Sequence, residues 1–174
     1  MKDSLINNFN AESSFNLKVI ARKGWTTINL INAIDSENIP ADFDLVTLLI
    51  GVNNQYQNRP FSTYEKEFPE LVAIAIKAVR NLASNLIVVS IPDYAFTPFG
   101  NGSTSISREI DKYNTFAKNY CEQNGITFIN ITEITGNGLI NPNLIVSDGL
   151  HPSKLTYTKF VELILPFVVK KLGD

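Results

Sequence analysis

The apolar residues of this chain follow two patterns that alternate along its length. Short, nearly continuous apolar runs are typical of strands buried on both faces of a parallel sheet. Such runs lie at residues 17–21, 44–50, 85–91 and 126–131. Between them, apolar residues recur at three- and four-residue intervals, which predicts helices. These helices are expected at about 26–34, 62–83, 104–123 and 153–171.

Strands that alternate with helices predict a three-layer α/β/α sandwich around a parallel sheet. The chain of 174 residues is long enough for one such domain, and we expect a single domain over residues 1–174. The spacing of Met1, Leu5, Ile6 and Phe9 indicates that the chain opens on a further helix. A fold of this class normally opens on a central strand, so this order is unusual.

Composition narrows the range of partners. A net charge of −2 provides no basic surface for nucleic acid or for anionic lipid. The single cysteine, Cys121, rules out an internal disulfide framework, and with only one histidine in the chain it argues against a structural zinc site. No apolar run approaches the roughly 20 residues of a membrane span. Composition therefore suggests neither a nucleic-acid partner nor a membrane span.

The only histidine lies in the stretch SDGLHPS at residues 147–153. Asp148 precedes His151 by three residues, and Gly149 allows a tight turn between them. The carboxylate can therefore reach Nδ1 of the imidazole and leave Nε2 free to accept a proton, as a general base requires. The alternative is a surface turn in which Asp148 acts only as a helix cap.

Two further segments follow predicted strands, where sites form in open α/β sheets. In RKGWTT, Gly24 can present its backbone N–H just before a helix N-terminus, where negative charge is favoured. In GVNNQY, Gly51 allows a sharp turn after which the amide of Asn53 can point at the sheet edge. The alternatives are an ordinary strand-to-helix glycine and an Asx turn.

Taken together and in this order, these motifs resemble those of the SGNH hydrolases, the GDSL-type lipases and acylhydrolases. The matching residues are the glycine of RKGWTT, the G-x-N of GVNN and the D-x-x-H-P of DGLHP. The resemblance implies a flavodoxin-like fold, with Gly24 and Asn53 as oxyanion-hole donors and Asp148 and His151 as acid and base of a catalytic triad. It implies no metal and no cofactor.

The resemblance also extends to one loop, and the chain differs from the family at one position. The loop IPDYAFTPFG at 91–100 is similar to a substrate-side loop in one bacterial branch, which makes Tyr94 and Phe96 candidate substrate contacts; packing within the loop is the alternative. The family often has an aspartate directly after the conserved asparagine, whereas this chain has Asn54.

The nucleophile that such a triad needs is not evident in the sequence. Ser4 in KDSL imitates the family's Gly-Asp-Ser block, but only Met1 and Lys2 lie before the Asp-Ser pair, so no strand can deliver the serine to a sheet edge. Its position also falls in the predicted first helix, too close to the run at 17–21 for a crossover connection. Ser90 lies inside a predicted strand, and Ser147 and Ser153 share the histidine loop.

We therefore expect a strand and a Gly-Asp-Ser turn upstream of Met1. Without that strand, two neighbouring strands would each have a free edge, with a cost of about 1–3 kcal/mol for each unpaired buried group. Localisation stays open, because a leader would also lie upstream.

Two functions of different classes follow from these motifs. The first is a serine-dependent ester hydrolase whose nucleophile lies upstream of Met1. The second is a non-catalytic binding module that has the same fold and lacks the nucleophile. A nucleotide-binding domain based on FGNGSTS at 99–105 is disfavoured, because this stretch lacks a third glycine and a phosphate-binding lysine.

Overall fold

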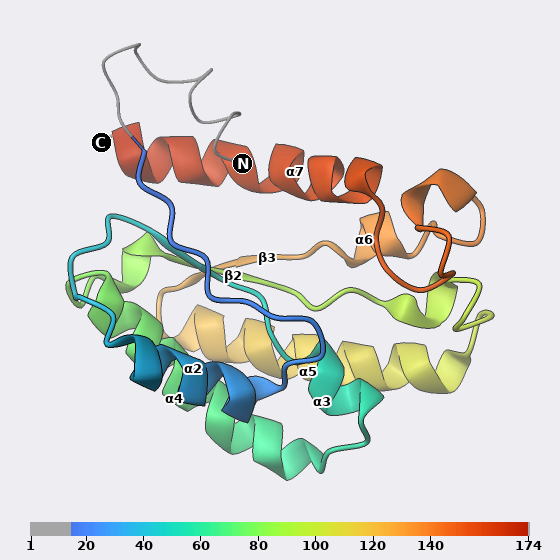
Figure 1. Ribbon diagram of the computed structural model, residues 1–174, viewed down its shortest axis with the longest axis horizontal. Helices are drawn as coiled ribbons and strands as arrows, with labels where there is room; N and C mark the ends of the chain where they lie inside the picture. The colour runs from blue at the N-terminus through green and yellow to red at the C-terminus, as the bar shows by residue number, and fades with distance from the viewer. Residues whose placement is uncertain (1–14, 174) are drawn as a thin grey trace.

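Parallel strands form the centre of the fold in the computed structural model, which describes residues 15–173 (Figure 1). Within this range the sheet has three strands in the order β1-β2-β3. Val46 of β1 lies opposite Leu86 of β2, and Ile87 of β2 lies opposite Thr127 of β3. The strands are β1 (Val46–Leu48), β2 (Leu86–Val89) and β3 (Thr127–Ile129).

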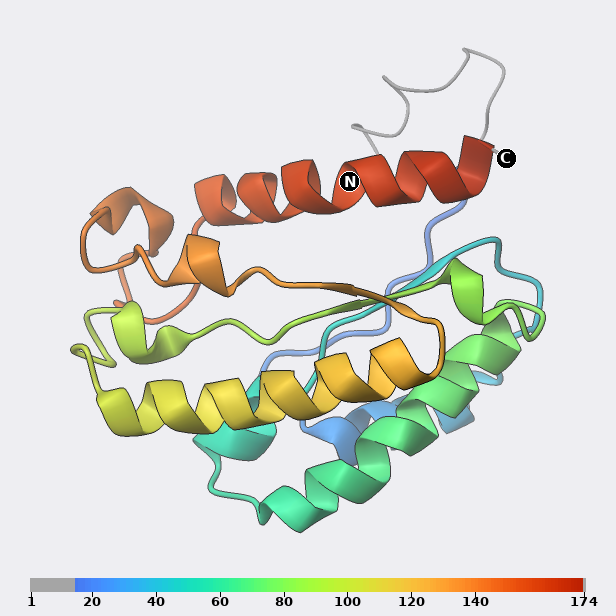
Figure 2. The same ribbon diagram turned by 180° about the vertical axis from the view of Figure 1, so that it is seen from behind.

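Helices cover both faces of this sheet (Figures 1 and 2). The helices α2, α4 and α5 lie on one face and α7 lies on the other. Six α-helices are described: α2 (Thr27–Glu37), α3 (Val52–Tyr56), α4 (Phe61–Ala78), α5 (Thr104–Gln123), α6 (Thr132–Thr135) and α7 (Lys154–Gly173). Single 3-10 turns lie at η1 (Ala83–Asn85), η2 (Tyr94–Phe96) and η3 (Pro142–Leu144). This arrangement confirms the predicted α/β fold class.

The central strand β2 shows why the sequence folds into layers. Successive side chains of a strand point to opposite faces. Leu86 and Val88 pack in the core with α2, α4 and α5, whereas Ile87 and Val89 pack in the core with α7. All four side chains are buried, so this strand needs apolar residues at every position, as its sequence has.

The predicted strand at 17–21 was wrong for this structure. These residues have no regular secondary structure, and the side chains of Leu17 and Val19 are 57% and 71% exposed. An apolar run becomes a strand only where a neighbouring strand accepts its backbone hydrogen bonds, and none of the three described strands pairs with this segment. The helix predicted at the start of the chain lies outside the described residues.

The remaining elements agree with prediction except at their ends. Helix α5 spans 104–123 as expected, and Thr26 is the N-cap of α2, in a capping box with Asn29. Helix α4 ends at Ala78 rather than near residue 83 and continues through Pro69. Each strand is shorter than its apolar run, because the flanking residues already turn toward loops.

Candidate active site

The segments singled out in the sequence gather near the carboxyl ends of the strands, at the right of Figure 1. Helix α3 follows β1, the loop 90–103 follows β2, and the loop 145–153 enters α7 at the same end of the sheet. This is the edge at which open α/β sheets form their sites.

Asp148 and His151 are in direct contact. Asp148 Oδ2 lies 2.6 Å from His151 Nδ1. The other carboxylate oxygen, Oδ1, accepts the backbone N–H groups of Leu150 at 2.9 Å and His151 at 3.0 Å. Gly149 makes the tight turn with a φ of 74°. The imidazole is therefore oriented through Nδ1, and Nε2 has no hydrogen-bond partner among residues 15–173.

The same hydrogen bonds lower the pKa of the carboxyl group. The backbone N–H groups of His151 and Leu150, and then the His151 ring, lower the pKa of Asp148 from 3.8 to about 2. Asp148 is thus ionised over the whole neutral range. The carboxylate can hold the Nδ1 proton of the imidazole there.

This assignment predicts the titration of Asp148. Because the backbone donors are the largest cause, His151→Ala should leave the pKa of Asp148 well below 3.8. The depressed pKa also means that the stability Asp148 contributes is present above about pH 4 and is lost as pH falls toward 2. NMR titration of the side-chain carboxyl carbon in both proteins tests this. A return to an ordinary pKa in His151→Ala would show that the ring dominates instead.

Gly24 and Asn53 also come together. Asn53 Nδ2 donates a hydrogen bond to the carbonyl oxygen of Trp25 at 3.1 Å. One amide proton of Asn53 is used in this bond, and the other is available to a ligand. Gly24 has a φ of 84°, and its backbone N–H makes no hydrogen bond within the described part of the chain. One donor therefore lies on the loop before α2 and the other in the neighbouring first turn of α3.

The sharp turn after β1 depends on Gly51. Its φ is 124°, and a Cβ atom at this position would lie only 2.7 Å from Cε2 of the buried Tyr64 ring. A side chain would need both a rare backbone conformation and a displaced core residue. Glycine therefore lets α3 begin at once and places Asn53 at the sheet edge.

The sequence analysis did not identify the residues that hold the segment from Gly24 to Thr27, here called the glycine loop, in place. Asn54 is 1% exposed; it accepts the Thr27 N–H at 3.0 Å and donates to Thr27 Oγ1 at 2.6 Å. Thr27 Oγ1 in turn donates to the carboxylate of Glu67. Gln57 Nε2 donates to the Gly24 carbonyl at 2.9 Å. The run NNQYQ at 53–57 could have indicated these contacts, because four of its five residues are amides that follow strand β1.

The loop after β2 lies between the Asp148–His151 pair and the Gly24–Asn53 pair. The Phe99 N–H donates to the Gly149 carbonyl at 2.9 Å, and the Phe99 ring lies 5.9 Å from the ring of Tyr56 in α3. The histidine loop therefore contacts the 90–103 loop, which contacts the helix that carries Asn53.

The two candidate substrate contacts differ in position. Tyr94 donates its hydroxyl to Gln55 Oε1 at 2.7 Å, and its ring lines an open cavity of about 540 Å³. Phe96 does not line this cavity; a Cβ atom added at Gly136 would lie 4.0 Å from its ring atom Cδ2. Aromatic rings and polar groups share the cavity: Gln55, Tyr56, Asn58, Tyr94, Phe99, Ser105, Ile106 and Glu109.

No serine of the described chain is hydrogen-bonded to His151. Ser90 is buried, where its hydroxyl donates to Asn130 Oδ1 at 3.1 Å. Ser153 donates to the Asn143 carbonyl at 2.6 Å. Ser4 lies outside the described residues.

Comparison with known proteins decides the family. The sequence pattern of the GDSL-like lipase/acylhydrolase family matches residues 2–159. The chain belongs to this family. No curated protein sequence matches it significantly.

Solved structures of this GDSL-type fold are similar to the chain at low sequence identity. A protein from Bacteroides fragilis assigned as an acylhydrolase has a TM-score of 0.67 at 20% identity, with 86% of this chain and 72% of that protein covered. A GDSL-like lipase from Bacteroides thetaiotaomicron has a TM-score of 0.66 at 21% identity, with 84% and 72% covered. A variant of an acetyl-xylooligosaccharide esterase from Geobacillus stearothermophilus has 0.63 at 20%, with 87% and 69% covered.

Two further properties of this GDSL-family chain concern the described residues alone. Between residues 15 and 173 no helix is both long and apolar enough to cross a membrane. No cluster of three or more histidine, cysteine, aspartate or glutamate side chains with metal-binding geometry occurs in the same range.

Proposed function

We propose that this protein hydrolyses carboxylic esters through a serine nucleophile carried by a segment upstream of Met1. The observation that supports the proposal most strongly is the 2.6 Å contact between Asp148 and His151, at the end of the sheet where Asn53 and Gly24 offer hydrogen-bond donors. Membership of the GDSL-like lipase/acylhydrolase family points to the same reaction class.

In the proposed reaction His151 takes up and releases a proton in each of two steps. Nε2 takes the proton of the serine hydroxyl as the serine oxygen forms a bond to the ester carbonyl carbon. The proton then goes to the departing alcohol oxygen as its bond to carbon breaks, which leaves an acyl-enzyme. Water then attacks the acyl carbon as His151 takes one of its protons. His151 returns this proton to the serine oxygen as the bond between that oxygen and the acyl carbon breaks, which releases the acid. Asp148 holds the ring and stabilises its charged form throughout.

Gly24 and Asn53 act on the charge that develops on the carbonyl oxygen. Their N–H groups would donate to this oxyanion in both tetrahedral intermediates. The cavity lined by Tyr56, Tyr94 and Phe99 lies beside the histidine loop and would receive the alcohol or the acyl part of the ester. The reaction requires no metal and no cofactor.

A covalent probe tests the proposal directly. We expect the protein, expressed with whatever its gene encodes before Met1, to hydrolyse an aryl acetate and to be inactivated by an alkyl fluorophosphonate. Mass spectrometry should then locate one phosphonylated serine outside residues 15–173. Labelling of a serine within this range, or hydrolysis without any labelling, would contradict the proposed nucleophile.

The second candidate is a non-catalytic binding module of the same fold. It is favoured by one observation, the lack of a serine hydroxyl at His151 in the part of the chain that the structure describes. For such a module neither hydrolysis nor phosphonylation would occur in the upstream-extended protein, while an ester analogue would still bind.

A further inference from the structure

A chain of three hydrogen-bonded side chains connects the glycine loop to α4. Asn54 of α3 accepts the backbone N–H of Thr27 at 3.0 Å through Oδ1, and its Nδ2 donates to Thr27 Oγ1 at 2.6 Å. Thr27 Oγ1 in turn donates to the carboxylate of Glu67 in α4. Thr27 and Asn54 are buried, and Glu67 is half-buried. The chain lies where α2, α3 and α4 come together (Figure 1).

Hydrogen-bond chemistry fixes the direction of this chain. A backbone N–H can only donate, so the amide oxygen of Asn54 faces the Thr27 N–H and the amide nitrogen faces Thr27 Oγ1. A threonine hydroxyl has a single proton. Because Asn54 already donates to Oγ1, that proton goes to Glu67, whose carboxylate only accepts. The chain therefore needs an amide at position 54 and an acceptor at position 67.

Three side chains of α3 attach the glycine loop, and they differ in burial. Asn53 and Gln57 donate to the carbonyl oxygens of Trp25 and Gly24, at 3.1 and 2.9 Å, and neither of these two side chains is buried. The third attachment, through Asn54, is buried. Water can replace a lost partner at an exposed group, whereas a buried group stays unpaired. The attachment through Asn54 therefore fixes the position of the loop most strictly.

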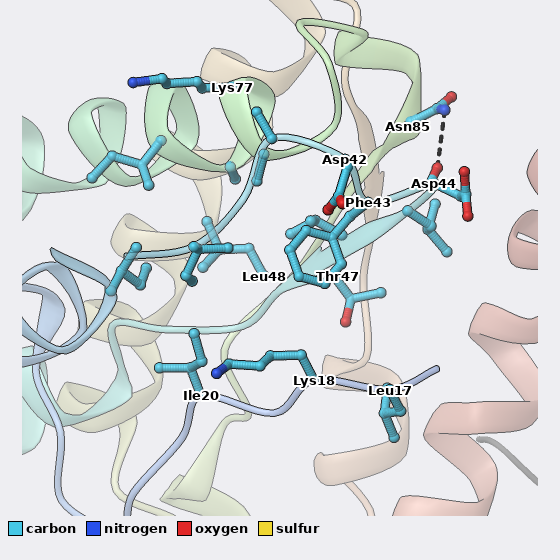
Figure 3. Close-up of a pocket in the computed structure, with 18 of the residues that line it drawn as sticks. Leu17, Lys18, Ile20, Asp42, Phe43, Asp44, Thr47, Leu48, Lys77 and Asn85 are labelled. Atoms are coloured by element: carbon cyan, nitrogen blue, oxygen red, sulfur yellow. Dashed lines mark hydrogen bonds between the residues drawn. The ribbon is translucent and has the colours of Figure 1, made fainter. Parts of the chain in front are cut away.

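The chain of side chains lies apart from the groove between β1 and the segment at 15–20 (Figure 3). This groove has a volume of about 970 Å³, and none of the three side chains lines it. Helix α4 borders the groove with Leu71, Ala75 and Lys77, which all lie beyond Glu67 along the helix. Substitution at position 54 or 67 therefore acts on the glycine loop and neither fills nor opens this groove.

We propose that Asn54 and Glu67 are a coupled pair of positioning residues, which act through the Thr27 hydroxyl to hold the glycine loop against α3. Neither side chain of the pair touches the ester. Their effect reaches it through the N–H of Gly24 and the amide of Asn53, whose relative position the loop sets. The inference rests on the proposed function for the role of these two donors, whereas the coupling of positions 54 and 67 follows from the hydrogen bonds alone.

Reversal of the chain tests the coupling, in the protein and with the aryl acetate of the covalent-probe experiment. Asn54→Asp places a second carboxylate at Thr27 Oγ1, and one hydroxyl proton cannot serve two carboxylates. We expect kcat to fall about tenfold or more and KM to stay within about twofold, because oxyanion donors act mainly in the transition state.

The double variant Asn54→Asp/Glu67→Gln should recover the lost rate. Its glutamine amide can donate to Thr27 Oγ1, and the hydroxyl proton then goes to the carboxylate at position 54, so that every group is paired again. We expect kcat to return to within about threefold of the parent value. Glu67→Gln alone should lower kcat by about threefold at most, since the amide oxygen can still accept from Thr27. Effects of the two substitutions are then far from additive.

Two threonine variants test the same chain if Asn54→Asp does not fold. Thr27→Val removes the hydroxyl and should lower kcat about tenfold or more, whereas Thr27→Ser keeps the hydroxyl and should stay within about threefold. Glu70→Gln is the matched control for Glu67. Glu70 is exposed on α4, three residues beyond Glu67, and forms no ion pair within residues 15–173, so its replacement should leave kcat and KM unchanged.

Hydrogen exchange measures the loop independently of the reaction. Exchange at residues 24–30, followed by mass spectrometry, should be about tenfold faster in Asn54→Asp and return to the parent rate in the double variant. If the double variant recovers neither kcat nor exchange, the coupled pair is overturned. Changed exchange with unchanged kcat would overturn the positioning role. If the parent protein hydrolyses no ester, the proposed function is contradicted, whereas the exchange rates still support or overturn the coupled pair.

Discussion

His151→Ala should lower kcat/KM for a short-chain aryl ester by about 10⁴-fold or more, because loss of the base leaves only oxyanion and binding contributions. The measurement is initial rates in the protein extended upstream of Met1. The side chain of His151 is 42% exposed, and among the described residues its only hydrogen bond is to Asp148, so the urea unfolding midpoint should barely change. A loss of rate caused by unfolding is thereby excluded.

Lys154→Ala is the matched control for this experiment. Lys154 is exposed at the start of α7, three residues beyond His151, and has no hydrogen-bonding side-chain partner in the described chain. Its replacement should leave the rate unchanged. If His151→Ala kept the rate within about tenfold of the parent protein, the base would have to be another group, and the proposed mechanism would be wrong.

Asn53→Ala should lower kcat by about 10²- to 10³-fold with little change in KM, since an oxyanion donor acts mainly in the transition state. Steady-state kinetics with the same ester measure both constants. Asn53 also tethers the glycine loop through Trp25, so a stability loss of about 1 kcal/mol is expected in urea unfolding.

Gln57→Ala distinguishes the two roles of Asn53, which are donation to the oxyanion and attachment of the glycine loop. Gln57 holds the same loop through the Gly24 carbonyl at 2.9 Å but presents no donor to the proposed oxyanion. It should reduce kcat far less than Asn53→Ala does. Equal losses in both variants would show that loop position, rather than the amide of Asn53, accounts for the effect.

The local elements were largely predictable because each depends on side chains close in sequence. The unbroken apolar run of β2 indicated burial on both faces, and Leu86 and Ile87 do pack on opposite layers. The Asp-x-x-His spacing indicated a carboxylate at Nδ1, and the 2.6 Å contact has that geometry. The catalytic roles of both residues stay predictions.

Residues that act across the fold were not predictable in the same way. Asn54 and Gln57 contact the glycine loop from positions about 30 residues away, and Phe99 connects this side of the site to Gly149. Nothing in the local sequence says which loops become neighbours, because only the strand order places them side by side.

The sequence by itself determined the alternation of strands and helices, the parallel sheet and the family motifs, since hydrophobic spacing and turn residues act over a few positions. Only the tertiary structure decided that residues 17–21 pair with none of the described strands and that, within residues 15–173, β1 pairs with β2 alone. The physical reason is that a strand exists through its neighbours: backbone hydrogen bonds between distant segments, not the apolar character of one segment, complete a sheet.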